Sequence, residues 1–163
     1  MIKLKALFAV LALSLSIHAF AMTDDESVEF TEAVGKGDLK IVKQYVAKDP
    51  KVVNEKFFAW SPIQMAATKG QLEMAKYLVE HGADVNYVHP VTQWTAFHLA
   101  AFDNYDSIVK YLAEHGADIN KKTKADISIV RIMKDEGARG ENMVKLLTSL
   151  GVKNDGCQEE KCF

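Results

Sequence analysis

The sequence predicts an all-α solenoid of about four stacked helix–turn–helix repeats with short β-turn fingers between them. Residues 76–86 recur, with two substitutions, 34 positions later as residues 110–120. Self-similarity at a period near ~33 residues is typical of stacked helical repeats. Leu72, Ala75 and Val79 fall at i, i+3 and i+7. The segment over residues 72–79 is therefore expected to form a helix with one apolar face.

The phase of this repeat divides the chain into units at about residues 24–57, 58–90, 91–124 and 125–153. In the two central units, a first helix is expected after Ser61 and after Thr95. Pro62 suits the first turn of such a helix, because its missing N–H would have no partner there. Gly70 and Asn104 then end these helices, since both residue types tolerate the left-handed conformation of a helix C-terminus. Leu78 and Leu112 are expected at buried repeat–repeat interfaces.

The two outer units are degenerate copies of the same pattern. Residues 33–39 align with residues 66–72, and Val52-Val53-Asn54 takes the place of the usual Asp-Val-Asn ending. The last unit carries about two extra residues around 137–140. Terminal repeats are expected to be atypical because they need a polar outer face.

Residues 1–21 have the pattern of a secretory signal peptide. Lys3 and Lys5 precede an apolar run over residues 6–17, which is too short to span a membrane, and Ala19-Phe20-Ala21 forms a small-x-small cleavage site. The alternative interpretation of residues 1–21 is a membrane anchor. Cleavage would place the protein in a bacterial periplasm, and loss of the two lysines would move the net charge from −2 to −4. That balance provides no basic patch for nucleic acid, and no membrane attachment is expected after cleavage.

The only cysteines are Cys157 and Cys162, in a short tail over residues 154–163. An oxidising compartment favours a disulfide between them. The alternatives are free or intermolecular thiols and a redox pair, although four intervening residues do not match the Cys-x-x-Cys spacing.

The sequence contains no motif for catalysis or for metal binding. It has no Gly-x-Ser-x-Gly, no His-Glu-x-x-His and no phosphate loop. His81 and His115 occupy equivalent positions in neighbouring repeats, which favours solvated or structural roles. We therefore expect no enzymatic activity, no cofactor and no metal.

The residues from Ser61 to Gly70 and from Thr95 to Ala101, together with two copies of Gly-Ala-Asp-Val/Ile-Asn, resemble the ankyrin repeat. The resemblance covers roughly residues 25–153 and implies a non-enzymatic module that binds a protein partner on its concave face. It also implies that His98 makes a structural hydrogen bond with the adjoining turn. At the positions that vary in such proteins, we expect partner-binding residues at Phe57, Phe58, Trp60, Trp94, Phe102 and Asp103. Exposed aromatic clusters usually mark interfaces. The alternative is that these aromatic side chains pack on one another.

Two roles follow from the resemblance alone. The protein would be a monomeric periplasmic adaptor that supports an enzyme such as a catalase, or an immunity protein that blocks a toxin delivered into the periplasm. An enzyme or a small-ligand carrier is a third, less favoured reading.

Overall fold

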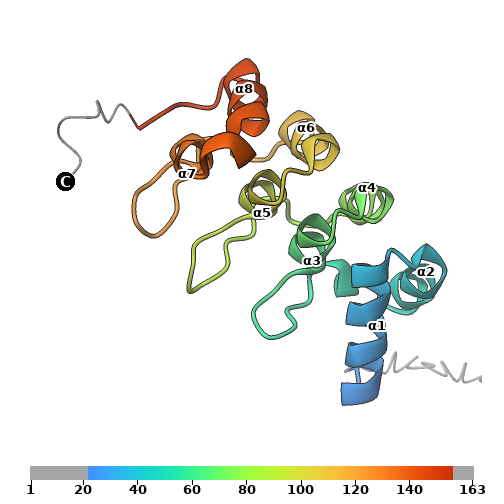
Figure 1. The fold of residues 1–163 in the computed structure, drawn as a ribbon. Coiled ribbons are helices and arrows are strands. Elements are labelled where there is room, and N and C mark those ends of the chain that lie inside the picture. Colours follow the sequence, from blue (N-terminus) through green and yellow to red (C-terminus); the bar gives the residue numbers. More distant parts are fainter. Residues whose placement is uncertain (1–21, 156–163) are drawn as a thin grey trace, which may run out of the picture.

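The computed structural model describes residues 22–155, and within them eight α-helices form four pairs that stack in sequence order (Figure 1). The first helices of the pairs pack on one another, α1 on α3, α3 on α5 and α5 on α7. The all-α repeat fold predicted from the sequence is therefore confirmed. The pairs are α1 (Asp24–Lys36) with α2 (Leu39–Lys48), α3 (Pro62–Thr68) with α4 (Leu72–Glu80), α5 (Ala96–Phe102) with α6 (Asp106–Glu114), and α7 (Ile129–Asp135) with α8 (Glu141–Ser149).

The predicted signal peptide and both cysteines lie outside the described residues, so cleavage after Ala21 and the Cys157–Cys162 disulfide stay predictions. Among residues 22–155, no helix is both long enough and apolar enough to cross a membrane.

The ends of the helices follow local side-chain chemistry. Pro62 is the first residue of α3, as the sequence predicts, and Thr95 caps α5 by accepting a hydrogen bond from the backbone N–H of His98. After the first helices, Gly70 (φ 69°) and Asn104 (φ 60°) adopt the left-handed conformation. A Cβ atom at Gly70 would come within 2.5 Å of the Tyr105 ring. Glycine is therefore required there both by the backbone conformation and by the approach of the next repeat.

The core runs along the whole stack between the two layers of helices. Leu78 and Leu112 are both completely buried, as the sequence predicts. Small residues line the contact between first helices, where Ala66 and Ala100 are also fully buried. Because the alanine side chain is a single methyl group, α3 and α5 can pack closely at these positions.

Asparagine side chains join each repeat to the next. The Asn54 amide donates to the carbonyl of Gly82 (2.7 Å), and its Oδ1 accepts from the backbone N–H of Asp84 (2.8 Å). Asn86 makes the same two bonds one repeat further on, at 2.9 and 2.7 Å. Asn120 accepts a bond from the backbone after α8 (2.8 Å). The Asn54 contacts show that the first unit ends like a complete repeat.

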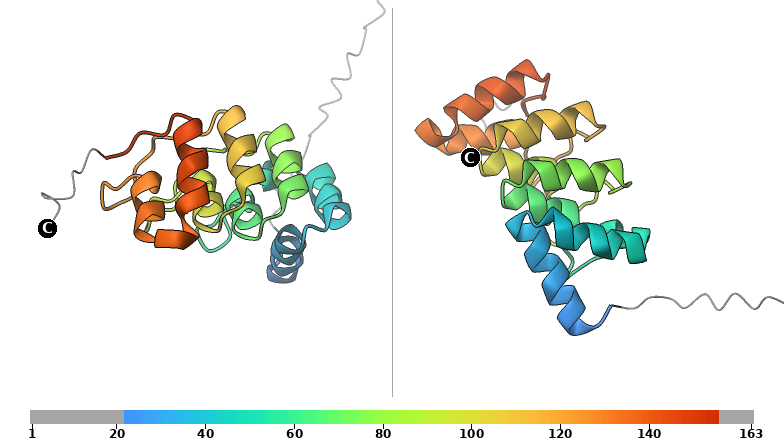
Figure 2. Two further views of the ribbon diagram at one scale, coloured as in Figure 1. Left: turned by 45° about the horizontal axis from the view of Figure 1, so that its top comes forward. Right: turned by 90° about the vertical axis from the view of Figure 1, so that its right-hand side faces the viewer.

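The outer units differ from the central ones in length. α1 has 13 residues, whereas α3, α5 and α7 have 7 each, and its N-terminal half extends beyond the stack (Figure 2). Thr23 and Glu26 form a capping box at its start. In the last unit, the extra residues form a short 3₁₀ helix, η2 (Gly137–Arg139). In the first unit, another 3₁₀ helix, η1 (Pro50–Asn54), follows α2.

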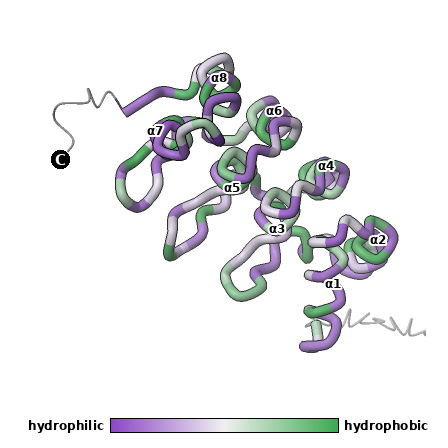
Figure 3. The backbone as a smooth tube through the Cα atoms, in the orientation of Figure 1, coloured by the Kyte–Doolittle hydropathy of each residue, from purple (hydrophilic) through white to green (hydrophobic). Residues whose placement is uncertain are grey.

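Three loops project from the same side of the stack, each leading into a first helix (Figure 1). We call them finger 1 (residues 55–61), finger 2 (87–95) and finger 3 (121–128). The fingers and the exposed sides of α1, α3, α5 and α7 make up the finger face. The tip of finger 1 is apolar (Figure 3), because Phe57, Phe58 and Ala59 follow one another there.

Candidate functional site

Finger 1 is a two-residue hairpin with both central residues in the left-handed region. The backbones of Phe57 and Trp60 exchange two hydrogen bonds, of 2.9 and 3.0 Å, and Phe58 (φ 51°) and Ala59 (φ 70°) lie between them. Such turns favour Asn and Gly, because other L-residues are strained at positive φ. This turn therefore holds a large aromatic residue in an unfavourable conformation.

The turn sends its two phenylalanines in opposite directions. Phe58 is 98% exposed, whereas Phe57 is 8% exposed and its ring lies 5.4 Å from that of Phe30 in the core. Phe57 was expected on an exposed aromatic patch, and this placement corrects that expectation. The reason is the turn itself, since residues at neighbouring positions of a hairpin point to opposite faces.

The second aromatic group lies where finger 2 meets α5. The Trp94 and Phe102 rings meet edge to face at 5.3 Å, and both side chains are half-buried. The Arg139 guanidinium stands 5.0 Å from the centre of the Phe102 ring. Asp103, the C-cap of α5, is also half-buried and adjoins this group. The structure thus brings together three of the residues predicted from the sequence.

Trp60 belongs to the same face but not to the same cluster. Its ring lies 4.8 Å from that of His89, which finger 2 contributes. The Tyr87 hydroxyl donates to the carbonyl of Ala59 at 2.9 Å, so fingers 1 and 2 are joined directly. Finger 3 is joined to finger 2 by a backbone bond from Lys124 to Thr92 (3.3 Å). The fingers therefore present their side chains as one connected surface.

Two surface features were not predicted. Val28 on α1 is 57% exposed, and Arg139 reaches Phe102 from a different repeat. Val91, at the tip of finger 2, is 65% exposed. The extra length of the last repeat indicated a local difference there, but it did not indicate that Arg139 would point towards Phe102. For Val28, the Thr-x-x-Glu capping box at Thr23 was a readable sign that α1 begins early.

Burial gives His98 a structural role. Its Nδ1 accepts a hydrogen bond from the Thr95 backbone N–H (3.2 Å), and its Nε2 then donates to the carbonyl of Lys121 (2.9 Å) at the start of finger 3. This confirms the expected bond with the adjoining turn. Burial lowers the pKa of His98 to about 4, so the ring is neutral near pH 7. Gln64 takes the same place in the preceding repeat: its Oε1 accepts from the Ser61 N–H (3.2 Å), and its Nε2 donates to the carbonyls of Tyr87 (3.4 Å) and Trp94 (2.8 Å).

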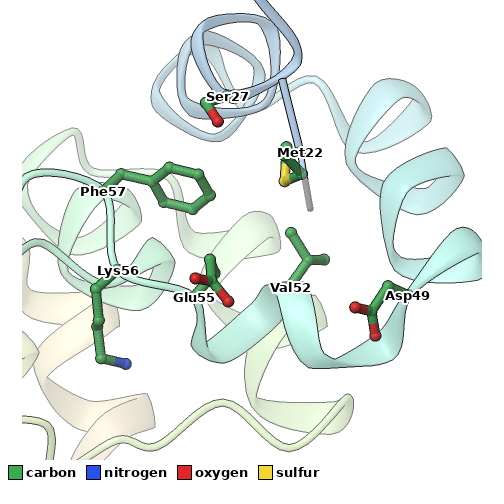
Figure 4. Close-up of a pocket in the computed structure, with 7 residues that line it drawn as sticks. All are labelled: Met22, Ser27, Asp49, Val52, Glu55, Lys56 and Phe57. Atoms are coloured by element: carbon green, nitrogen blue, oxygen red, sulfur yellow. The ribbon is translucent and has the colours of Figure 1, made fainter. Parts of the chain in front are cut away.

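A hollow of about 250 Å³ lies on the other side of Phe57, between the start of α1 and η1 (Figure 4). Met22, Val52 and Phe57 supply apolar walls, and Asp49 and Glu55 supply carboxylates. Asp49 is already used locally, because its Oδ1 accepts from the backbone N–H of Lys51 (2.9 Å). No group of three or more His, Cys, Asp or Glu side chains in the described part of the chain is arranged to hold a metal ion.

A stack of paired helices with a connected row of fingers defines a helical-repeat solenoid, a class that offers an extended binding surface. The family model described as Ankyrin repeats (3 copies) matches residues 30–123. The chain therefore belongs to the ankyrin repeat family. A comparison with curated proteins gave no match. Ankyrin repeats are generally protein–protein interaction modules and are typically not enzymes.

Proposed function

We propose that this protein is a periplasmic, non-enzymatic adaptor that binds a protein partner on its finger face. The observation that carries the proposal is the set of aromatic side chains on this face, with Phe58 almost wholly exposed and Trp60, Trp94 and Phe102 half-buried. Aromatic residues are enriched among the anchors of protein interfaces, because they bury a large area with few rotatable bonds.

The packing alternative accounts for part of this set only. Trp94 and Phe102 contact each other, and Trp60 contacts His89, but no side chain of the described residues covers Phe58. An exposed phenylalanine in a strained turn has no packing reason within residues 22–155. A partner that covers Phe58 would supply one.

The proposed role is support of a periplasmic enzyme, and resemblance to secreted ankyrin proteins makes a catalase the first candidate. The periplasmic location rests on the signal-like pattern of residues 1–21, with cleavage before Met22. Mass analysis of the purified protein tests it, since a chain that retains residues 1–21 would contradict export and processing.

Capture from periplasmic extract, followed by mass spectrometry, tests partner binding. The wild-type chain and a Trp60→Ala/Trp94→Ala variant are immobilised side by side, after a thermal melt has shown that both are folded. We expect an enzyme that the wild type retains and the variant loses. A toxin captured with the same dependence would assign the immunity role instead. Equal capture by both chains would contradict binding at the finger face.

A further inference from the structure

Two adjoining hollows form a groove along α1 at the N-terminal end of the finger face. The first, of about 490 Å³, is bordered by Asp24, Val28 and Phe58. The second, of about 270 Å³, is bordered by Gly35, Trp60 and Lys69, among others. Thr31 lines both hollows, so they are continuous along the helix. We call this feature the α1 groove.

One face of α1 forms the floor of the groove. Asp24, Ser27, Thr31 and Gly35 are spaced by three, four and four residues, which places them on one side of the helix. The adjoining side of α1 carries Phe30, Ala33 and Val34, which are buried in the core. This floor spans twelve residues, from Asp24 to Gly35, which is an axial distance of ~17 Å at 1.5 Å per step. Its residues are small, so another chain can approach the α1 backbone closely.

Gly35 borders the groove, and packing within residues 22–155 gives no reason for a glycine there. It lies inside α1, where glycine is less favourable than alanine. A Cβ atom there would meet only the Cγ of Lys69, at 3.9 Å, which is an ordinary contact. A side chain longer than that of alanine would instead project into the groove.

Phe58 in finger 1 is the second residue at this groove whose conformation has no packing reason within the described residues. Phe58 holds a left-handed conformation at φ 51° while its ring is 98% exposed. Strained residues without a packing role often mark functional sites. Gly35 and Phe58 stand at the two ends of the α1 groove, so a single occupant would account for both.

We propose that the α1 groove binds an amphipathic α-helix of a protein partner, which runs antiparallel to α1. This inference rests on the proposed function, because the groove is part of the finger face. The charges of the groove set the direction. Asp24 stands at the end near the start of α1, and Lys69 stands at the other end. A helix usually carries acidic residues in its first turn and basic residues in its last turn. Antiparallel packing brings its acidic turn to Lys69 and its basic turn to Asp24.

An extended peptide fits this groove less well than a helix. The backbone bonds of finger 1 are used between Phe57 and Trp60, and the Ala59 carbonyl accepts from Tyr87. Finger 1 contains a single isolated bridge and not a strand, so within the described residues it offers no extended edge of the kind that binds extended peptides. A helix satisfies its own backbone and needs only side-chain contacts, for which Val28, Phe58 and Trp60 provide apolar surface.

Selection of displayed peptides tests the inference without knowledge of the partner. The probe is a library of fourteen-residue peptides with apolar residues at i, i+3, i+4 and i+7 and random residues in the first and last turns. The purified chain is the target and its Gly35→Leu variant is the counter-target. We expect selected peptides to carry acidic first turns and basic last turns. Exchange of these end charges in the best peptide should weaken binding at least tenfold.

Variants of the chain locate the bound peptide. Gly35→Leu fills the floor of the groove, and Phe58→Asn removes the exposed ring; each should weaken binding at least tenfold. Lys36→Leu is the matched control, because it adds the same side chain to the neighbouring exposed position and should leave binding unchanged. Leucine favours helix, so Gly35→Leu should melt no lower than the wild type. Selected peptides without charge order, or equal binding to Gly35→Leu, would overturn the inference.

The two proposals can fail separately. If a captured partner is lost by Trp60→Ala/Trp94→Ala but binds normally to Gly35→Leu, then the finger face is a binding site and the α1 groove is not. A partner that binds to all of these variants as it binds to the wild type would contradict both proposals.

Discussion

The guanidinium group of Arg139 lies 5.0 Å from the centre of the Phe102 ring and donates a hydrogen bond to the Phe102 carbonyl at 3.0 Å. These residues belong to different repeats. Arg139 comes from the extra turn η2 of the last unit, so this insertion reaches back and holds the end of α5. Its Nη1 also pairs with Glu136 at 2.7 Å, which fixes the direction of the side chain.

Arg139→Ala should lower the free energy of unfolding by about 1 kcal/mol, because a partly exposed cation–π contact contributes ~0.5–1 kcal/mol and the bond to the carbonyl adds to it. Urea denaturation measures this change. Arg131→Ala is the control, since Arg131 is a half-exposed arginine of α7 that makes no ion pair within residues 22–155. Equal losses in the two variants would show that the Phe102 contact contributes nothing.

His98 should make the fold sensitive to acid. The unfolded chain binds a proton on this ring near the ordinary pKa of 6.5, whereas the folded chain binds it only near pKa 4. Stability from the neutral ring is therefore complete above pH 6.5 and is lost as the pH falls towards 4. The whole effect is on the order of 3 kcal/mol, since each pKa unit corresponds to ~1.4 kcal/mol.

His98→Gln is the variant that isolates this effect. Gln64 already makes the equivalent two bonds in the preceding repeat, from the Ser61 N–H and to the Tyr87 carbonyl, so glutamine fits the site and does not titrate there. Urea melts between pH 4 and 7 should show a smaller loss of stability for His98→Gln than for the wild type. Parallel pH curves would mean that other groups cause the acid sensitivity.

Leu78→Ala and Leu112→Ala should each destabilise the fold by about 2–5 kcal/mol, because both side chains are fully buried between repeats and their removal leaves cavities. Leu72→Ala, in a half-buried position of α4, should cost less. The midpoints of guanidinium denaturation give the comparison. Losses below about 1 kcal/mol at both buried sites would contradict the assigned core.

Replacement of Phe58-Ala59 by Asn-Gly should stabilise the fold by about 1 kcal/mol. Asn and Gly suit a hairpin turn in which both central residues have positive φ, and no contact within the described residues is lost with the Phe58 ring. The same change should weaken partner binding, because the exposed ring is removed. Thermal melts and calorimetry measure the two effects separately. A destabilised variant would show that the Phe58 ring supports the fold.

The repeats were predictable because their signals are local. The left-handed ends at Gly70 and Asn104 and the buried Leu78 follow from residue type and helical spacing. Phe57 and Phe58 could not be told apart, since the hairpin that separates them places residues in a conformation that their own preferences oppose. The contact between Arg139 and Phe102 depends on the direction in which the inserted turn η2 leaves the stack, and the sequence period does not predict that direction. The positions of the fingers could therefore be predicted from the sequence, whereas the structure was needed to tell which of their side chains are exposed.

Trp94 provides the sharpest test of whether the aromatic residues bind or pack. Its backbone carbonyl accepts bonds from Gln64 and from the His89 N–H, and neither depends on the ring. Trp94→Ala therefore removes mainly the edge-to-face contact with Phe102, for which we expect about 1 kcal/mol of stability and a fall in melting temperature of about 3 °C.

Loss of an interface anchor should cost more than this loss of packing. Partner affinity should fall by about 2 kcal/mol, which corresponds to a dissociation constant roughly thirtyfold weaker. Calorimetry with the captured partner, beside a melt of each variant, separates the two effects. Val91→Ala, an apolar truncation at the exposed tip of the same finger, is the control and should change both quantities little. If Trp94→Ala melts far earlier than expected but its folded fraction binds like the wild type, then the ring belongs to the fold and the partner binds elsewhere.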